Sequence, residues 1–481
     1  MAESREYWMR RRGFILAAIG SAIGLGNIWR FSWLAYRNGG GAFLVPYFIA
    51  LLSIGVPLLI LEFLLGNYFQ GSSVTAFKKI RDQLEIIGWI AILDVFIIGT
   101  YYSVVLGWVM DYIGYSAVVA WKDIGAGDLF NSLITNPWLQ LIGFTITWFI
   151  TWITVYKGVS GGIERASTFA IPVLWILSAI LVIRGITLAG ADVGINWYLK
   201  PDWARLADGK VWIDAFGQIL FTLSVMAGPL VVYAKYMPRN SELPNSAWIT
   251  AFANCGFSFF FGFATWGIIG YMMSLQGVTT PADLNVPLGG AGLAFVTIPT
   301  ATSLLPGGIA VAAVFGTIFF IILWLAGYTS LISIVEPVHA ALNEKFGTSR
   351  KFNVTLITIL SYIIGLTFIF RVDLIDPVDF IAGSTNLVWV VLLEAVIAGY
   401  FYSLKKLRDY ANPYAELKLG EWFDFLIRYV VPIIMGIILV YGLISTDTMS
   451  PISGLVLILL VIASTVFAGS KWKTIETTQE R

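Results

Sequence analysis

The stretch GSAIGLGNIWR, from Gly20 to Arg30, places three glycines, an asparagine and an arginine inside an otherwise apolar segment. A helix in hydrocarbon normally avoids such interruptions, because each unpaired backbone group there costs several kcal/mol. Breaks survive at membrane depth only where they are buried in protein or line a cavity. Polar residues at that depth, such as Asn27 and Arg30, also usually face a cavity or a partner. The stretch therefore predicts an interrupted helix beside an internal cavity.

The composition of the whole chain indicates a membrane protein. Of its 481 residues, 58% are hydrophobic and 12% are charged, whereas about 25% of a soluble domain is charged. The mean hydropathy is +0.80. A net charge of +1 provides no basic surface for nucleic acid. Cys255 is the single cysteine and His339 the single histidine, which excludes an intramolecular disulfide and argues against a Cys/His metal site.

Apolar segments of about 20 residues, the length that crosses a bilayer, can be placed about twelve times. The first follows the N-terminal MAESREYWMRRRGF directly and is too long for the apolar region of a secretory signal. We therefore expect an all-α membrane protein with about twelve transmembrane helices. The expected spans are 13–36, 42–69, 87–115, 139–156, 165–186, 211–236, 245–273, 308–340, 352–371, 378–402, 424–446 and 451–469. The longer loops, 116–138, 187–210 and 274–307, should form ordered caps, the last of them a lid.

Lysine and arginine are concentrated on one side of this arrangement. They precede the first span and follow the second, eighth, tenth and last spans, while the opposite loops carry few cations. By the positive-inside rule, both termini are predicted to be cytoplasmic. Short termini and compact loops favour the plasma membrane of a prokaryote. The cations are Arg5, Arg10, Arg11, Arg12, Lys78, Lys79, Arg81, Lys345, Arg350, Lys351, Lys405, Lys406, Arg408, Lys471 and Lys473.

A second break is predicted at SVMAGP, Ser224–Pro229, in the sixth span. If the first ten spans form two sets of five, the two breaks occupy matching positions, which is the sequence signal of a transporter's central site. Carbonyls released by unwinding can coordinate a cation, and helix N-termini can hold an anionic group. Gly20 and Gly24 alone would fit close helix packing equally well, but packing does not explain the polar residues beside them.

Several segments together resemble the signature segments of the neurotransmitter:sodium symporter family, and in particular its prokaryotic leucine-transporter-like members. These segments are REYWMRRRGFILAAIGSAIGLGNIWRF (5–31), NGGGAFLVPY (38–47), VWIDAFGQILFTLS (211–224), LAGYTSLISIVEP (325–337) and VDFIAG (378–383). The resemblance implies two inverted five-helix repeats, 13–186 and 211–402, with helices 1 and 6 broken. Two peripheral helices would occupy 424–469, a cytoplasmic segment with an inner gate 1–12, and a cytoplasmic tail 470–481.

The same resemblance implies two sodium sites and no covalent cofactor. Uncharged oxygens suit such a hard monovalent cation. On spacing alone, Thr329 and Ser330 would more readily be read as bonding to neighbouring helices or to their own carbonyls; the matched motif favours sodium. The first site would use Ala22, Asn27, Thr222 and Asn254 with the substrate carboxylate, and the second Gly20, Ile23, Ala326, Thr329 and Ser330.

The substrate would lie between the two breaks. Family members that carry monoamines have an aspartate at the position of Gly24, so glycine here implies a zwitterionic amino acid. The mostly apolar lining disfavours polar side chains, because each unpaired polar group costs about 1–3 kcal/mol. Ser21, Met226 and Ala227 depart from the leucine-transporter pattern, which leaves aliphatic and aromatic ligands both open. The implied substrate residues are Ser21, Ala22, Gly24, Leu25, Gly26, Ile98, Tyr102, Phe221, Thr222, Ser224, Met226, Ala227, Ser330 and Ile334.

A chloride site is also implied, at Tyr47, Gln218, Thr222 and Ser258. Many prokaryotic relatives carry an acid where Ser258 stands, and without that fixed charge a cation-rich site is left uncompensated. The rival is Asp94 in the third span, which could supply the negative charge, take up protons, or remain a neutral hydrogen-bonded group.

Two gates complete what the resemblance implies. The outer gate would pair Arg30 with Asp379 above the ligand, beside Tyr102 and Phe221. The inner gate would pair Arg5 with Glu344, a glutamate at the family's usual aspartate position, near Trp8 and Tyr236. An ordinary surface ion pair, worth about 0–1 kcal/mol, is the alternative for Arg5. Further intramembrane acids, Glu62, Glu336 and Glu394, are expected to be network partners.

These features predict a sodium-coupled symporter of a neutral, mainly apolar amino acid, working by alternating access in the lipid bilayer. A carrier of glycine or alanine, and an amino-acid sensor that does not transport, remain alternatives. A ligand-gated channel would need a continuous polar pore, which the apolar outer lid opposes. A membrane enzyme is disfavoured because the sequence contains no HExxH, no Walker-type loop and no nucleophile–base pair.

Overall fold

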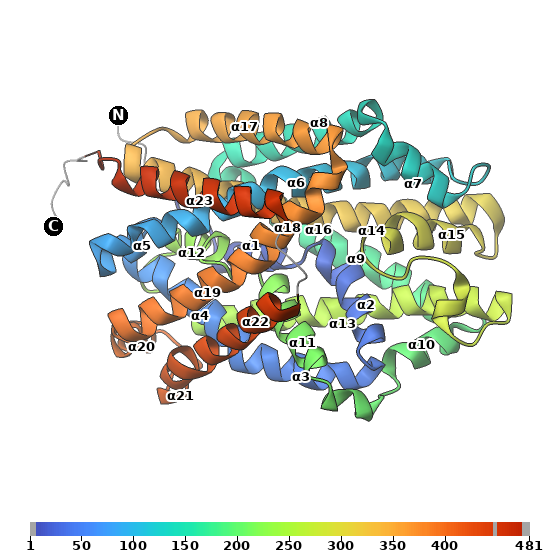
Figure 1. Cartoon of the computed structure of the whole chain (residues 1–481), viewed down its shortest axis with the longest axis horizontal. Helices are drawn as coiled ribbons and strands as arrows, with labels where there is room; N and C mark the ends of the chain where they lie inside the picture. Colours follow the sequence, from blue (N-terminus) through green and yellow to red (C-terminus); the bar gives the residue numbers. More distant parts are fainter. Residues whose placement is uncertain (1–5, 446–449, 474–481) are drawn as a thin grey trace.

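The protein is a bundle of helices (Figure 1). The computed structural model describes residues 6–445 and 450–473. Within these residues, ten helical segments are long and apolar enough to cross a membrane. They are Gly40–Phe69, Asp82–Ala117, Pro137–Tyr156, Val159–Ile186, Pro244–Gln276, Gly308–Phe346, Arg350–Phe370, Val372–Phe401, Glu421–Gly442 and Pro451–Gly469.

The α-helices of these spans are interrupted in places by single π turns. A π turn inserts an extra residue into the helix and often marks a functional position. The α-helices are α3 (Leu44–Ala50), α4 (Val56–Phe69), α6 (Glu85–Ala117), α8 (Pro137–Tyr156), α9 (Glu164–Ile186), α13 (Pro244–Gln276), α16 (Gly308–Phe346), α17 (Arg350–Phe370), α18 (Ile375–Asp379), α19 (Leu387–Val396), α21 (Glu421–Phe425), α22 (Val431–Ser445) and α23 (Pro451–Gly469).

Two further spans are broken. α1 (Arg11–Ala22) and the segment Gly26–Arg37, which contains α2 (Phe31–Arg37), form one span with a bend of 59°. In the predicted sixth span lie α11 (Gly209–Thr222) and α12 (Pro229–Lys235). Each half is shorter than the roughly 20 residues that cross a bilayer. In the described residues ten segments, or eleven with the bent first pair, are long and apolar enough to cross a membrane; α11 and α12 stand at the position of the remaining expected span.

Short helices occupy the loops at the two ends of the bundle. α5, α20 and α21 lie at one end of the bundle, on the left in Figure 1, which we call the base. α7, α10 and α15 lie at the opposite end, on the right in Figure 1, which we call the top. The loops expected to be caps therefore contain helices. The short helices are α5 (Ser73–Ile80), α7 (Ala126–Thr135), α10 (Ala191–Leu199), α14 (Gly290–Gly292), α15 (Ile298–Ser303) and α20 (Leu404–Ala411).

The two broken spans are enclosed by the long ones. α1 packs against α9, α13 and α16, and α12 packs against α4 and α16. At the periphery, by contrast, large apolar side chains such as Phe149 on α8 and Ile363 on α17 are more than half exposed, as expected of a surface that faces lipid. The interruptions are thus kept away from hydrocarbon, as the cost of unpaired backbone requires.

The last turn of α16 joins three parts of the base. Lys345 is fully buried; it donates to the Glu85 carboxylate of α6 and, at 2.6 Å, to the carbonyl of Phe467 on α23. The neighbouring Glu344 accepts a hydrogen bond from Lys235 of α12 at 2.6 Å. Adjacent side chains therefore connect α16 to a peripheral helix and to a broken span.

Candidate functional site

The first helix break is shaped by one amide side chain. α1 ends at Ala22, and Ile23 is extended with φ of −73° and ψ of 107°. The side-chain oxygen of Asn27 accepts a hydrogen bond from the backbone N–H of Gly24 at 2.8 Å. This bond satisfies a donor that the interrupted helix leaves free. The span resumes with the π turn Gly26–Arg30, so the interruption predicted from the sequence is present.

The second break spans residues 223–228. Ser224 and Ala227 have left-handed backbones, with φ of 54° and 53°, a conformation that costs a non-glycine residue about 1–3 kcal/mol. The Glu62 carboxylate of α4 accepts a hydrogen bond from the N–H of Ala227 at 2.7 Å. Pro229 restarts the helix in its first turn, where a missing N–H is tolerated. A buried carboxyl group thus holds the strained segment in place.

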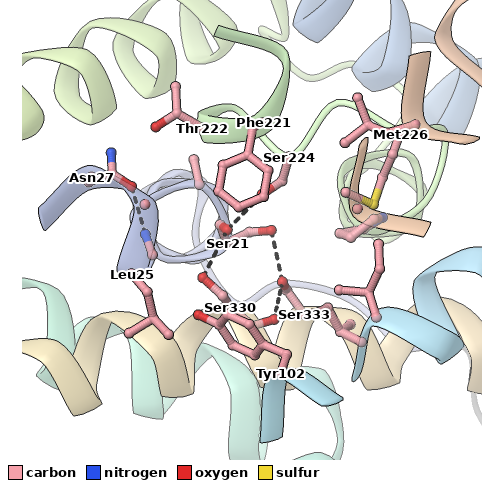
Figure 2. Close-up of a pocket in the computed structure, with 18 of the residues that line it drawn as sticks. Ser21, Leu25, Asn27, Tyr102, Phe221, Thr222, Ser224, Met226, Ser330 and Ser333 are labelled. Carbon is pink, nitrogen blue, oxygen red and sulfur yellow. Dashed lines mark hydrogen bonds between the residues drawn. The ribbon is translucent and has the colours of Figure 1, made fainter. Parts of the chain in front are cut away.

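A cavity of about 90 Å³ lies between the two breaks. Asn27 and Met226 lie at opposite ends of this group of side chains (Figure 2). All of the predicted substrate residues line the cavity except Ala227, which is buried outside the lining. The lining consists of Ser21, Ala22, Gly24, Leu25, Gly26, Asn27, Ile98, Tyr101, Tyr102, Phe221, Thr222, Ser224, Met226, Pro229, Ser330, Ser333, Ile334, Asp379, Gly383 and Leu387.

Several lining residues were missed by the sequence analysis, and helical spacing could have found most of them. Gly383 and Leu387 follow Asp379 at intervals of four residues, and Ser333 follows Ser330 at an interval of three. Residues at these spacings share one face of a helix. Ser333 also accepts a hydrogen bond from the hydroxyl of Ser21 at 2.8 Å, which joins α16 to α1 (Figure 2).

Oxygen atoms converge at one side of the cavity, where the first sodium site is predicted. The side-chain oxygen position of Asn254 lies 3.1 Å from the carbonyl oxygen of Ala22 and 3.2 Å from that of Thr222. Three acceptors at such distances repel one another unless a cation or an N–H lies among them. A cation meets this need, and so does the Asn254 amide when its NH₂ turns toward the two carbonyls. The three oxygens, of Asn254, Ala22 and Thr222, are therefore suitable ligands for a sodium ion.

A second group of oxygens surrounds Ser330, where the other sodium site is predicted. The Ser330 hydroxyl lies 3.3 Å from the carbonyl of Ile23, 3.5 Å from that of Gly20 and 3.2 Å from that of Ala326. One hydroxyl proton cannot satisfy all of these acceptors. The Thr329 hydroxyl donates to the Ala326 carbonyl at 3.0 Å, as the alternative of back-bonding predicts. The surplus of acceptors around Ser330 is what fits a cation.

All four residues of the predicted chloride site are buried. Within the described part of the chain, the hydroxyl of Tyr47 and the amide of Gln218 make no hydrogen bond. Buried polar groups are nearly always paired, so these donors fit an anion. Ser258 accepts a hydrogen bond from the Asn27 amide at 2.8 Å, which links this group to the first break. Asp94 of α6 instead accepts a hydrogen bond at 3.1 Å from Asn386, the residue just before α19.

Three of the outer-gate residues, Tyr102, Phe221 and Asp379, line the cavity, but Arg30 and Asp379 are not joined directly. Over residues 6–445 and 450–473, no ion pair within 4.0 Å connects them. The Arg30 guanidinium lies 4.7 Å from the centre of the Phe221 ring, and the Asp379 carboxylate accepts a hydrogen bond from Tyr101 at 2.6 Å. Cation and carboxylate are each held by an aromatic residue instead.

The structure describes Glu344, Trp8 and Tyr236 of the predicted inner gate. Arg5 lies outside the described residues. Glu344, its predicted partner, binds Lys235, as described above, and also the hydroxyl of Ser72 at 2.6 Å. Trp8 donates to the carbonyl of Tyr233 at 2.7 Å, so it does lie beside the second broken span.

Arg350 instead forms the centre of an ion network at the base. Its guanidinium binds Glu6 at 2.5 Å and Glu336 at 2.6 Å, and Glu336 also accepts a hydrogen bond from Tyr236 at 2.6 Å. Burial raises the pKa of the Glu6 carboxyl, although Arg350 beside it acts in the opposite direction. In the sequence alone Arg350 is only an orientation signal, because a partner as distant along the chain as Glu6 leaves no local signature.

The left-handed backbone at Ala227 can be tested by substitution. Ala227→Val places a β-branched side chain at a positive φ and at a fully buried position, so we expect it to destabilise the protein by about 1–3 kcal/mol. The change should appear as a lower midpoint of thermal unfolding in detergent. Ala227→Gly, which removes the steric conflict, should leave the midpoint unchanged or raise it. Equal midpoints for the valine and glycine variants would contradict the observed backbone.

Comparisons with known proteins agree on one family. The sequence matches the model of the sodium:neurotransmitter symporter family over residues 5–133 and 131–454. It is 40% identical over 443 residues to an uncharacterized sodium-dependent transporter of Methanocaldococcus jannaschii, covering 90% of this chain and 89% of that protein. It is 30% identical over 493 residues to the human sodium- and chloride-dependent creatine transporter 1, covering 90% of this chain and 76% of that protein.

A solved structure gives the same result for the fold. The crystal structure of MhsT in complex with L-phenylalanine matches with a TM-score of 0.80 and 30% identity, covering 91% of this chain and 100% of that one. The predicted fold class, an all-helical membrane protein of leucine-transporter type with a broken first span, is thereby confirmed. The chain belongs to the sodium:neurotransmitter symporter family, and it is a multi-pass membrane transporter and not an enzyme.

Proposed function

We propose that this protein takes up a neutral amino acid together with sodium by alternating access. One observation carries the proposal: two groups of uncharged oxygens flank a cavity made by two broken helices. Such oxygens replace the water around an alkali cation, while the cavity holds the solute. The names of the archaeal relative and of MhsT with its bound L-phenylalanine support sodium and an amino acid respectively.

The substrate carboxylate is proposed to complete the first sodium site. A Cβ atom on Gly24 would lie 3.1 Å from the Ser330 hydroxyl and 3.5 Å from the Tyr102 hydroxyl, so this position leaves little room for an acidic side chain. The negative charge must then come from the ligand. Tyr102 makes no hydrogen bond to the rest of the described structure, and its O–H is available to donate to that carboxylate.

The size of the cavity supports a small side chain. A cavity of about 150 Å³ holds benzene, whereas this one measures about 90 Å³. Alanine or glycine therefore fits the observed conformation, which favours the second candidate, a carrier of small amino acids. Met226 is half-buried at one end of the cavity, and its flexible thioether can move. An apolar side chain of leucine or phenylalanine size would need that movement.

Sodium entry supplies enough free energy for accumulation. One cation moving down about 100 mV gains about 2.3 kcal/mol, and a tenfold gradient adds about 1.4 kcal/mol. Two sodium ions then provide roughly 7 kcal/mol, which corresponds to about 10⁵-fold accumulation of a neutral solute. We further propose that both termini are cytoplasmic, since the cations that follow the second and tenth expected spans lie on α5 and α20, at the base of the bundle.

Sodium coupling can be tested at Thr329. Thr329→Val keeps the shape of the side chain and removes its hydroxyl, and a bond to a charged group is worth about 1.5–3 kcal/mol. The sodium concentration for half-maximal alanine uptake into proteoliposomes should therefore rise about tenfold or more. The matched control is Thr151→Val on α8, whose hydroxyl also back-bonds, to Thr147 at 2.8 Å. If both variants behave alike, Thr329 only back-bonds and the second sodium site is wrong.

Chloride dependence is a separate proposal that rests on the unpaired donors of Tyr47 and Gln218. Replacing chloride by gluconate should lower the affinity for sodium and amino acid about tenfold or more, because sodium is then left without a compensating charge. Tyr47→Phe should raise the chloride concentration that is required, whereas Tyr112→Phe, buried near the top, should not. If binding of sodium and amino acid did not depend on the anion, the chloride site would be wrong. Asp94 would then be the candidate for the compensating negative charge.

Met226 is predicted to set the size of the side chain that is accepted. Met226→Ala enlarges the cavity, and one methylene in such a pocket is worth about 10–200-fold in discrimination. The ratio of the Kd for L-phenylalanine to that for L-alanine should therefore fall by about tenfold or more. Met435→Ala, a fully buried methionine of the peripheral α22, controls for lost packing. An unchanged ratio would show that Met226 does not limit the cavity.

A further inference from the structure

Two hydrogen bonds join α6 to the segment Val372–Phe401 on one side of the central cavity. The Tyr101 hydroxyl of α6 donates to the Asp379 carboxylate at 2.6 Å. Seven residues before Tyr101, Asp94 accepts a bond from Asn386 at 3.1 Å, and Asn386 follows Asp379 by seven residues. Seven residues make about two helical turns, so both bonds lie along one face of each segment. They fix how the two segments are aligned.

The backbone between these two bonds is irregular. Directly after Asp379, where α18 ends, Phe380–Asn386 form a π-helical segment, a feature that often marks a functional position. Gly383 lies within this segment and lines the cavity. A Cβ atom on Gly383 would overlap the Asp379 carboxylate and would lie 2.9 Å from the Tyr101 hydroxyl. The missing side chain therefore leaves room for the bond between Tyr101 and Asp379.

The ring of Tyr101 is fixed in place. Tyr101 is 5% exposed. Its ring packs edge-on against Phe368 of α17, with the two ring centroids 6.1 Å apart, which is a favourable aromatic arrangement. Because the ring is held by its surroundings, its hydroxyl defines one position for the carboxylate that it binds.

Arg30, the expected partner of Asp379, is held elsewhere. Its guanidinium lies 4.7 Å from the centre of the Phe221 ring. The electrostatic attraction of Arg30 is nevertheless directed toward Asp379 first and toward Asp214 second. Opposite charges in a partly desolvated place attract each other strongly, so this pair is expected to close unless another contact holds it apart. For Asp379 that contact is the hydrogen bond from Tyr101.

We propose that Tyr101 is a positioning residue of the outer gate, whose hydroxyl holds the Asp379 carboxylate apart from Arg30 while the gate is open. This inference rests on the proposed uptake, which requires the cavity to open and close. On closing, Asp379 exchanges the Tyr101 hydroxyl for the Arg30 guanidinium, and Arg30 leaves the Phe221 ring. The carboxylate has a partner in both arrangements, so neither leaves a buried charge unpaired.

Removing the hydroxyl tests the direction of this effect. In Tyr101→Phe the open arrangement loses its bond to Asp379, so the gate should stay closed for longer. The dissociation rate of labelled L-alanine from sodium-loaded protein in nanodiscs should fall about fivefold or more, because a bond to a charged group is lost from the open state only. Gly383→Ala, whose Cβ atom displaces the carboxylate from Tyr101, should act in the same direction. Faster or unchanged release in Tyr101→Phe would overturn the proposal.

A second substitution separates the gate from direct contact with the ligand, because Tyr101 also lines the cavity. In Arg30→Gln the cation is absent, so Asp379 gains no ion pair when the hydroxyl is removed. Tyr101→Phe should therefore leave the dissociation rate unchanged in this background. Equal slowing in both backgrounds would show that Tyr101 acts on the ligand and would overturn the proposal. Tyr362→Phe, which removes a hydroxyl bonded to Thr145 at 2.8 Å outside the cavity, should behave as the wild type.

A measurement without ligand separates the gate from the proposed function. Ile98→Cys, combined with Cys255→Ala, places a single thiol in the cavity. Without sodium or amino acid, a cationic methanethiosulfonate reagent should modify this thiol about fivefold or more slowly when Tyr101→Phe is added. An unchanged or faster rate would overturn the gate proposal even if alanine is transported. Slower modification without sodium-dependent alanine binding would support the gate and count against the proposed uptake. Gel filtration and the midpoint of thermal unfolding identify any variant that does not fold.

Discussion

Backbone carbonyls and N–H groups that lie within a membrane without a helical partner are the constraint on which the rest of this structure depends. They arise at two places, after Ala22 and after Thr222, and neither place faces lipid. Each break is supplied with one side chain that captures a freed N–H: Asn27 at the first and the Glu62 carboxylate at the second. The remaining carbonyls are left as acceptors, and the proposed cation sites rest on this excess.

The two supporting side chains differ in what they add. Asn27 is neutral and reaches further, donating through its amide to Asn254 and Ser258 at 2.8 Å each. Hydrogen bonds therefore connect the first break to a residue of the predicted first sodium site and to one of the predicted chloride site. Glu62 has no such continuation; one of its oxygens holds Ala227, and the other is unpaired within the described structure. The second break is thus anchored to a neighbouring helix and not to the ion-binding groups.

Sequence alone could predict those features that leave a local signature. The glycines and Asn27 within an apolar span identify the first break, and SVMAGP identifies the second, because both violate what hydrocarbon demands of a helix. Features that depend on side-chain direction were not accessible. Ala227 does not line the cavity, and its N–H is bonded to Glu62. Arg30 lies over Phe221 and not against Asp379. Neither choice follows from spacing.

The end of α16 has a consequence for how the base could open. Glu344 and its partner Lys235 retain 14% and 12% side-chain exposure, while Lys345 and its partner Glu85 retain 0% and 5%. Solvent entering from below would weaken the first of these attachments well before the second, since screening acts on charges that water can reach. At two adjacent residues, α16 thus carries one ion pair to α12 that solvent can reach, and one attachment to α6 and α23 that is shielded from solvent. An opening of the base would therefore separate α16 from α12 before it separated α16 from α6 and α23.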